Sequence, residues 1–127
     1  MPVTLTIDVE KRLVYSAFLG DITEEEFLQH SRTIESHPKF DPTFSEIVDF
    51  RSVTDVTVSK DALQAMAGKK SIFADSAHHV IIAPSGLITV LARMFQALAE
   101  ETRPNFAVVK TPAEAYAYLR EHLGTKS

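Results

Sequence analysis

Three short segments with the pattern of buried strands, each followed by the start of a helical pattern, constrain the fold of this chain more than any other feature. They occupy residues 46–50, 79–83 and 106–109. Continuous apolar runs are typical of strands in parallel sheets, where both faces are covered. Strands that alternate with helices in this way predict a mostly parallel sheet with right-handed crossover connections.

The start of the chain shows the period-two alternation of half-buried strands. Residues 3–9 and 13–19 alternate apolar and polar side chains, and the polar pair Glu10-Lys11 separates them. The second run ends at Gly20. Two such runs joined by a short polar turn predict a β-hairpin.

Four helices are predicted from their start signals. The first follows Thr23, which forms a capping box with Glu26, and it ends before Pro38. Its predicted inner face is Phe27, Leu28, Ser31 and Ile34.

The other three helices have their own start signals. Ser59 is expected to cap a helix that carries Leu63, Met66 and Phe73. Ser85 is expected to cap a helix over 86–101, and Thr111 with Glu114 forms a second capping box for the last helix.

The chain is therefore predicted to be α/β, with a mixed, mostly parallel sheet of about five strands, a β-hairpin start and four helices, in the order β-β-α-β-α-β-α-β-α. No linker or internal repeat divides the sequence. Residues 1–127 are expected to form a single domain.

Composition and charge exclude several classes of protein. The chain has no cysteine and a net charge of −4, and its densest basic spot is Lys69-Lys70. Disulfides, thiolate chemistry and nucleic-acid binding are therefore not expected. The most apolar stretch, 86–99, is short and is interrupted by Arg93, so no membrane span is predicted. Because residues 1–4 do not resemble a signal peptide, a cytoplasmic location is expected.

No arrangement typical of an enzyme or a metal centre is found. Ser85 lies between a buried run and a helix, but the Gly-x-Ser-x-Gly of a nucleophile elbow is absent. His78 and His79 are adjacent, so on a strand they point to opposite faces. His30 and His37 lack the spacing of a helical metal pair. The sequence predicts no catalytic residue, no metal and no cofactor.

Four segments resemble the SpoIIAA-like family of small bacterial proteins, and the resemblance extends over nearly the whole chain. They are 20–23, 48–51, 91–96 and 111–119. The resemblance implies a STAS-type fold and a non-enzymatic regulatory or interaction module that binds a protein partner or a small anion. A comparison with SEC14-like domains implies the alternative, a carrier or sensor of an apolar small molecule or lipid.

The resemblance also implies a candidate phosphorylation site. Anti-anti-sigma factors of this fold carry a modified serine after their third strand, and Ser59 and Thr57 lie at the matching place. The sequence Val-Thr-Val-Ser-Lys over 56–60 replaces the Asp-Ser-Ser-Gly of those factors. Ser59 can serve as a helix cap or as a regulated residue.

Ligands of open α/β sheets favour the carboxyl ends of the strands, beside helix N-termini. Residues that meet there by topology form a candidate anion site: Asp49, Arg51, Ser85, Gly86 and Lys110. The alternative interpretation is capped helix ends and a structural Asp49–Arg51 pair.

The helix over 86–101 is more apolar than packing on one sheet requires. Its polar stripe is narrow, and consists of Thr89, Arg93, Gln96 and Glu100. The surplus apolar face can meet a neighbouring helix, a second subunit, a ligand or a membrane surface. We favour a homodimer, with a candidate dimer or apolar-ligand face at Ile88, Val90, Met94 and Phe95. The carrier alternative predicts a cavity lined by Met66, Phe73, Met94 and Phe95.

Overall fold

Strands and helices follow one another in the predicted order in the computed structural model, which describes residues 3–123. The strands are β1 (Val3–Asp8), β2 (Leu13–Thr23), β3 (Ser45–Thr57), β4 (His79–Ile82) and β5 (Phe106–Val109). The helices are α1 (Glu24–Glu35), α2 (Lys60–Gly68), α3 (Leu87–Leu98) and α4 (Pro112–Leu123).

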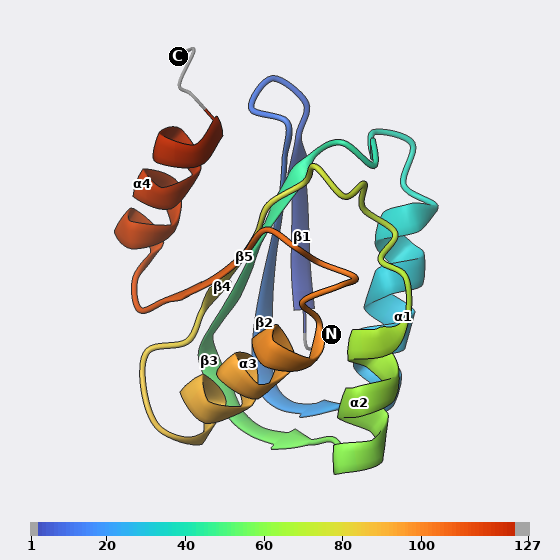
Figure 1. Cartoon of the computed structure of the whole chain (residues 1–127), viewed down its shortest axis with the longest axis vertical. Coiled ribbons are helices and arrows are strands. Elements are labelled where there is room, and N and C mark those ends of the chain that lie inside the picture. The colour runs from blue at the N-terminus through green and yellow to red at the C-terminus, as the bar shows by residue number, and fades with distance from the viewer. Residues whose placement is uncertain (1–2, 124–127) are drawn as a thin grey trace.

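The five strands form one mixed sheet in the order β1-β2-β3-β4-β5. The hairpin pair β1–β2 is antiparallel, and every later pair is parallel. Helices α1, α2 and α3 cover one face of the sheet, and α4 covers the other (Figure 1). The predicted fold class, α/β with a hairpin start, is confirmed.

The face covered by α4 holds a closely packed apolar cluster. Its buried members are Leu13, Ile47, Val80, Ile82, Ala115 and Leu119. Each comes from an inward position of its strand or helix, as alternation and helical spacing require. Burying an isoleucine or leucine side chain contributes about 1.5–3 kcal/mol. This face of the sheet therefore anchors the C-terminal helix.

Strand β3 is much longer than its neighbour β4. It spans 13 residues, whereas β4 spans four, and only 46–49 of β3 pair with β4. The predicted strand over 46–50 was too short, and β2 likewise runs past Gly20 to Thr23. Residues 19–23 of β2 pair with the outer part of β3, after register shifts around Gly20. There both strands curve towards α1 and α2 (Figure 1).

Both predicted capping boxes are present. The Glu26 N–H donates to Thr23 Oγ1 at 3.3 Å, and the Thr23 N–H donates to Glu26 Oε1 at 2.7 Å. The same reciprocal pair joins Thr111 and Glu114, with both distances 3.1 Å. These bonds satisfy backbone donors that have no partner within the helix.

Two helices differ from their predicted bounds. Helix α2 ends at Gly68, so Phe73 lies in the following loop, where its side chain is still buried. Helix α3 begins after Gly86, which has a φ of 74°, and Ser85 does not cap it. Instead, the Thr89 hydroxyl donates to the carbonyl of Ala83 at 3.0 Å. A positive φ is readily adopted by glycine, which explains why Gly86 occupies the cap.

Ser59→Ala should lower the free energy of unfolding by about 1 kcal/mol. The reason is that Ser59 Oγ accepts the Ala62 N–H at 3.0 Å and caps α2, as predicted. Chemical denaturation measures the change. Ser59→Asp is the control, because aspartate is an equally good cap. An equal loss in both variants would contradict a capping role.

Candidate functional site

A cavity of about 710 Å³ lies between the sheet and the three helices that cover the same face. This volume is within the range of about 300–1,000 Å³ that is usual for small-molecule pockets. Side chains on the helix-covered face of the sheet line one side of the cavity, and side chains of α1, α2 and α3 line the other. Apolar lining residues include Val48, Phe50, Leu63, Ile81, Ile88 and Leu91.

Aromatic rings form a large part of the wall. The ring centroids of Phe18 and Phe27 are 5.2 Å apart, those of Phe18 and Phe50 are 5.5 Å apart, and those of Phe27 and Phe50 are 6.1 Å apart. Phe95 and Phe106 also line the cavity, and their ring centroids are 5.8 Å apart. Tilted and edge-to-face pairs at these distances are favourable and hold the rings in place.

The residues predicted for a carrier cavity all lie in this wall. Met66, Phe73, Met94 and Phe95 line it, although Phe73 reaches it from the loop after α2 rather than from the helix.

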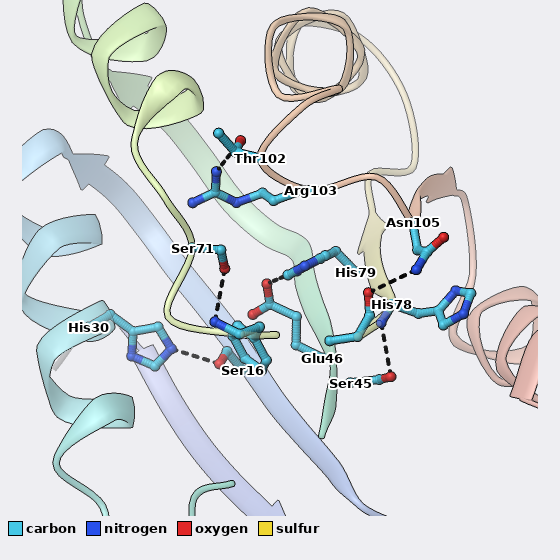
Figure 2. Close-up of polar contacts among 12 residues, drawn as sticks. Ser16, His30, Ser45, Glu46, Ser71, His78, His79, Thr102, Arg103 and Asn105 are labelled. Carbon is cyan, nitrogen blue, oxygen red and sulfur yellow. Dashed lines mark hydrogen bonds and ion pairs between the residues drawn. The ribbon is translucent and has the colours of Figure 1, made fainter. Parts of the chain in front are cut away.

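A carboxylate and a histidine form a polar pair on the sheet face of the cavity (Figure 2). Glu46 and His79 are directly opposite each other in the β3–β4 register, and Glu46 Oε2 is 2.7 Å from His79 Nδ1. The His79 ring lies between the rings of Phe73 and Phe106, at 5.3 and 6.2 Å. The carboxylate of Glu46 lines the cavity, whereas the side chain of His79 is enclosed behind it.

A second buried histidine was not predicted. His30 on α1 lies 2.6 Å, Nε2 to Oγ, from Ser16 on β2. Burial lowers the pKa of His30 below its ordinary value, while the charge of Glu46 acts in the opposite direction. The burial of His30 could have been predicted from the sequence, because Phe27, His30 and Ile34 have the spacing of one helix face.

The outermost part of the wall contains a largely buried arginine. Arg103, in the loop before β5, donates from Nη1 to Thr102 Oγ1 at 3.0 Å and to the carbonyls of Lys69 and Ala67 at 3.3 and 3.4 Å. Its guanidinium lies 5.2 Å from the ring centroid of Phe95, within cation–π range. Burial lowers the pKa of Arg103 from its ordinary value, and Glu46 opposes this change.

The lining carries an excess of positive charge, although the whole chain is negative. Five cationic residues line the cavity, namely Arg32, Lys60, Lys69, Lys70 and Arg103, against the two glutamates Glu35 and Glu46. The difference is three positive charges. Arg32 and the three lysines are exposed, so they form a basic rim around an apolar interior.

The two adjacent histidines point to opposite faces, as alternation predicts. His79 belongs to the cavity side, whereas His78 Nδ1 lies 3.0 Å from the Tyr118 hydroxyl on α4. Burial, helped by the neighbouring His122 and His79, lowers the pKa of His78.

The candidate anion site lies at the carboxyl ends of the strands, outside the cavity. Arg51 binds Asp49 through Nε and Nη2, at 3.0 and 2.8 Å, and Tyr15 donates to the same carboxylate at 2.8 Å. Burial acts to raise the pKa of Asp49, but the hydrogen bonds outweigh it and the pKa lies below its ordinary value. Burial and the bond to Asp49 raise the pKa of Tyr15 to about 12.

The remaining members of that site are exposed, and so is Thr57 of the candidate phosphorylation site. Ser85 and Gly86 lie in the loop before α3, and Lys110 follows β5. The Lys110 N–H donates to Glu114 Oε1 at 2.8 Å, within the cap of α4. Anion binding here, and modification of Ser59 or Thr57, stay predictions.

The predicted face of α3 divides into two flanks. Ile88 and Phe95 are half-buried and line the cavity, whereas Val90 is 54% exposed and is not part of the lining. Met94 is 38% exposed and also lines the cavity. Two predicted polar positions instead bond to the backbone: Thr89 to Ala83, and Gln96 to the carbonyl of Phe106 at 2.9 Å. Leu87 and Leu98 are also exposed, so one stripe of the solvent-facing side of α3 is apolar, whereas the exposed Arg93 lies beside it.

Residues 3–123 contain neither a membrane-spanning helix nor a cluster of metal-binding side chains. No helix in that range is both long and apolar enough to cross a membrane. In the same range no three or more histidine, aspartate or glutamate side chains are grouped so that they could hold a metal ion.

Comparison with known proteins identifies the fold. No protein-family model and no curated protein matches the sequence. A solved structure does match: an uncharacterized protein of the DUF3478 family with a SpoIIAA-like fold, from Shewanella loihica PV-4. It is 17% identical, and the match covers 92% of this chain and 93% of that one with a TM-score of 0.61. The chain has a SpoIIAA-like fold, as its resemblance implied.

The free energy of unfolding should fall as the pH drops below about 6.5, the ordinary pKa of histidine. His30 and His78 have lowered pKa values, so the folded chain binds fewer protons than the unfolded chain in this range. Denaturation at a series of pH values between about 7.5 and 5 measures the slope. His30→Gln, which keeps a hydrogen-bonding group beside Ser16, should flatten it. An unchanged slope in the variant would show that His30 is not buried in its neutral form.

Proposed function

We propose that the chain binds an apolar or amphiphilic small molecule in the cavity and acts as a non-enzymatic carrier or sensor of it. The single observation that supports this most is the cavity itself, about 710 Å³ with aromatic and aliphatic walls. Of the two functions left open by the sequence, this is the one that requires a cavity rather than a filled core. The proposal treats residues 1–127 as one binding domain.

The energetics of packing support a bound ligand. Protein interiors are normally packed as densely as organic crystals, and an apolar cavity destabilises a fold in proportion to its volume. A molecule that fills the space restores the lost contacts and stabilises the folded state by mass action. The rings of Phe18, Phe27 and Phe50 hold one another in place, so the wall is formed before the ligand arrives.

Binding fits the polar groups of the cavity better than catalysis does. Glu46 and His79 are the acid–base candidates, but the ring of His79 stacks on Phe106, meets Phe73 edge-on and is 1% exposed. A general acid or base must reach within hydrogen-bond distance of its substrate. Glu46 alone faces the cavity, which suits recognition of a ligand.

Leu63→Trp should reduce the affinity for the neutral fluorophore N-phenyl-1-naphthylamine by about tenfold or more, because the larger side chain occupies the cavity. Fluorescence titration measures the affinity. Leu123→Trp is the matched control, because Leu123 lies at the end of α4 on the other face of the sheet. Equal binding by both variants would contradict a ligand site in the cavity. Native mass spectrometry of protein purified from its own host then gives the mass of any retained molecule.

The exposed flank of α3 supports a second function, self-association as a STAS-type interaction module. Leu87, Val90, Met94 and Leu98 are 61%, 54%, 38% and 41% exposed at helical spacing. Contiguous exposed apolar side chains are typical of interaction surfaces. Met94 also lines the cavity, so this flank adjoins the cavity at Met94, whereas Ile88 and Phe95 lie on the other flank.

Val90→Glu should weaken self-association by about tenfold or more, because a charge would be buried in the interface without a partner. Sedimentation velocity over a range of concentrations measures the effect. Phe95→Glu is the less specific change, since the ring of Phe95 packs on Phe106 in the cavity wall. A wild-type chain that remains monomeric at all concentrations would remove the dimer from consideration.

A further inference from the structure

We propose that the ligand carries a single carboxylate, and that the guanidinium of Arg103 recognises it. This inference rests on the proposed function and names the chemical class of its ligand: an apolar chain or ring system with one carboxylate head group.

One edge of the Arg103 guanidinium is anchored and the other is open. Nη1 makes all of the side chain's hydrogen bonds within residues 3–123, to Thr102, Lys69 and Ala67. Every fully buried side-chain nitrogen or oxygen of the non-exposed residues in that range has a partner. Nε and Nη2, which have none there, are therefore not fully enclosed by protein atoms. Their N–H bonds point in the same direction and form a two-donor fork.

The position of this fork is fixed before any ligand binds. Phe95 lies 5.2 Å from the guanidinium carbon, and two backbone carbonyls at the end of α2 hold Nη1. Arg103 lines the same cavity as Ser71 and Glu46, and the three side chains lie around a common space in Figure 2. An arginine held in this way loses little conformational entropy when it binds a planar anion.

Arg103 forms no ion pair within residues 3–123, although the charge of Glu46 is near enough to oppose the lowering of its pKa by burial. No carboxylate of the described residues lies within 4 Å of it, and the carboxylate of Glu46 is bonded to His79. A largely buried charge without a counterion is unfavourable, and an anion that binds to it removes this cost. The exposed Lys69 and Lys70 at the rim add a field that attracts anions.

The chemistry of the site favours a carboxylate over a phosphate. A carboxylate has two oxygens in one plane, and it matches a two-donor fork. A phosphate monoester carries a charge of about −1.5 to −2 and has three oxygens to satisfy. Glu46, whose charge is close enough to affect the pKa of Arg103, would repel the additional negative charge. A head group with one negative charge and two coplanar oxygens, a carboxylate, therefore fits the two donors of Arg103 best.

Three ligands with the same chain length allow the effect of the head group on affinity to be compared. They are dodecanoate, 1-dodecanol and dodecylammonium. Displacement of N-phenyl-1-naphthylamine from the full chain gives the affinity of each. In the wild type, dodecanoate should bind about tenfold or more tightly than dodecanol, as expected for hydrogen bonds to a charged group. In Arg103→Met this ratio should fall to near one. Arg120→Met, the same substitution on α4, should leave the ratio unchanged.

The ratio between two ligands within one variant is insensitive to a general loss of cavity affinity. Should Arg103→Met fail to fold, Arg103→Lys retains a charge without the fork and should give an intermediate ratio. A preference for dodecanoate as strong as in the wild type, in either variant, would overturn the role of Arg103.

Other outcomes distinguish this inference from the proposed function. Equal affinity of the wild type for dodecanoate and dodecanol would overturn the proposal that a carboxylate is recognised. It would not contradict the binding of an apolar ligand in the cavity. Tightest binding of dodecylammonium would also overturn it and assign head-group recognition to Glu46. If neither the fluorophore nor any of the three ligands bound, the proposed function itself would fail, and this inference with it.

Discussion

The unequal length of β3 and β4 is the constraint on which the rest of the structure depends. β3 pairs with β2 along nearly its whole length but with β4 only over 46–49. Beyond that point β3 has one neighbour, and strand pairs that are not flattened by a wider sheet twist strongly. The outer halves of β2 and β3 therefore curve towards α1 and α2 (Figure 1). Val48, Phe50 and Val56 thus form one side of a cavity instead of lying under a flat layer of helices.

Much of the fold was predictable because its signals are local. Apolar runs placed the later strands, and the two capping boxes placed the starts of α1 and α4, since a cap depends on residues three apart. The length of β3 was missed because the predicted strand ended at Phe50, the last large aromatic or aliphatic residue of the segment 46–50. Residues 52–58 are rich in valine and threonine, which favour strands, but they are half-exposed and carry no apolar run.

The candidate site was predictable only in part, because its polar members come from separate elements. Met66, Phe73, Met94 and Phe95 were expected in a cavity wall, since the surplus of apolar side chains on α3 required a cover. Arg103 was not identified, because a lone arginine in a loop has no distinguishing pattern. His30 was considered only as a metal ligand, although its spacing from Phe27 and Ile34 fits the buried face of α1. Only the packed structure shows that Arg103 has anchored and open edges.

Glu46 and His79 show how register creates a site that spacing cannot reveal. Each residue lies at or near the start of its strand, where a polar side chain usually indicates that the chain is reaching the surface. In the parallel β3–β4 register the two residues are opposite each other and on the same face. Cross-strand neighbours interact directly, so their hydrogen bond follows from the pairing of the strands. The hydrogen bond to the buried ring of His79, which contacts Phe73 and Phe106, gives the Glu46 carboxylate a partner at the cavity wall. The same pairing that shapes the apolar wall therefore determines where the cavity is polar.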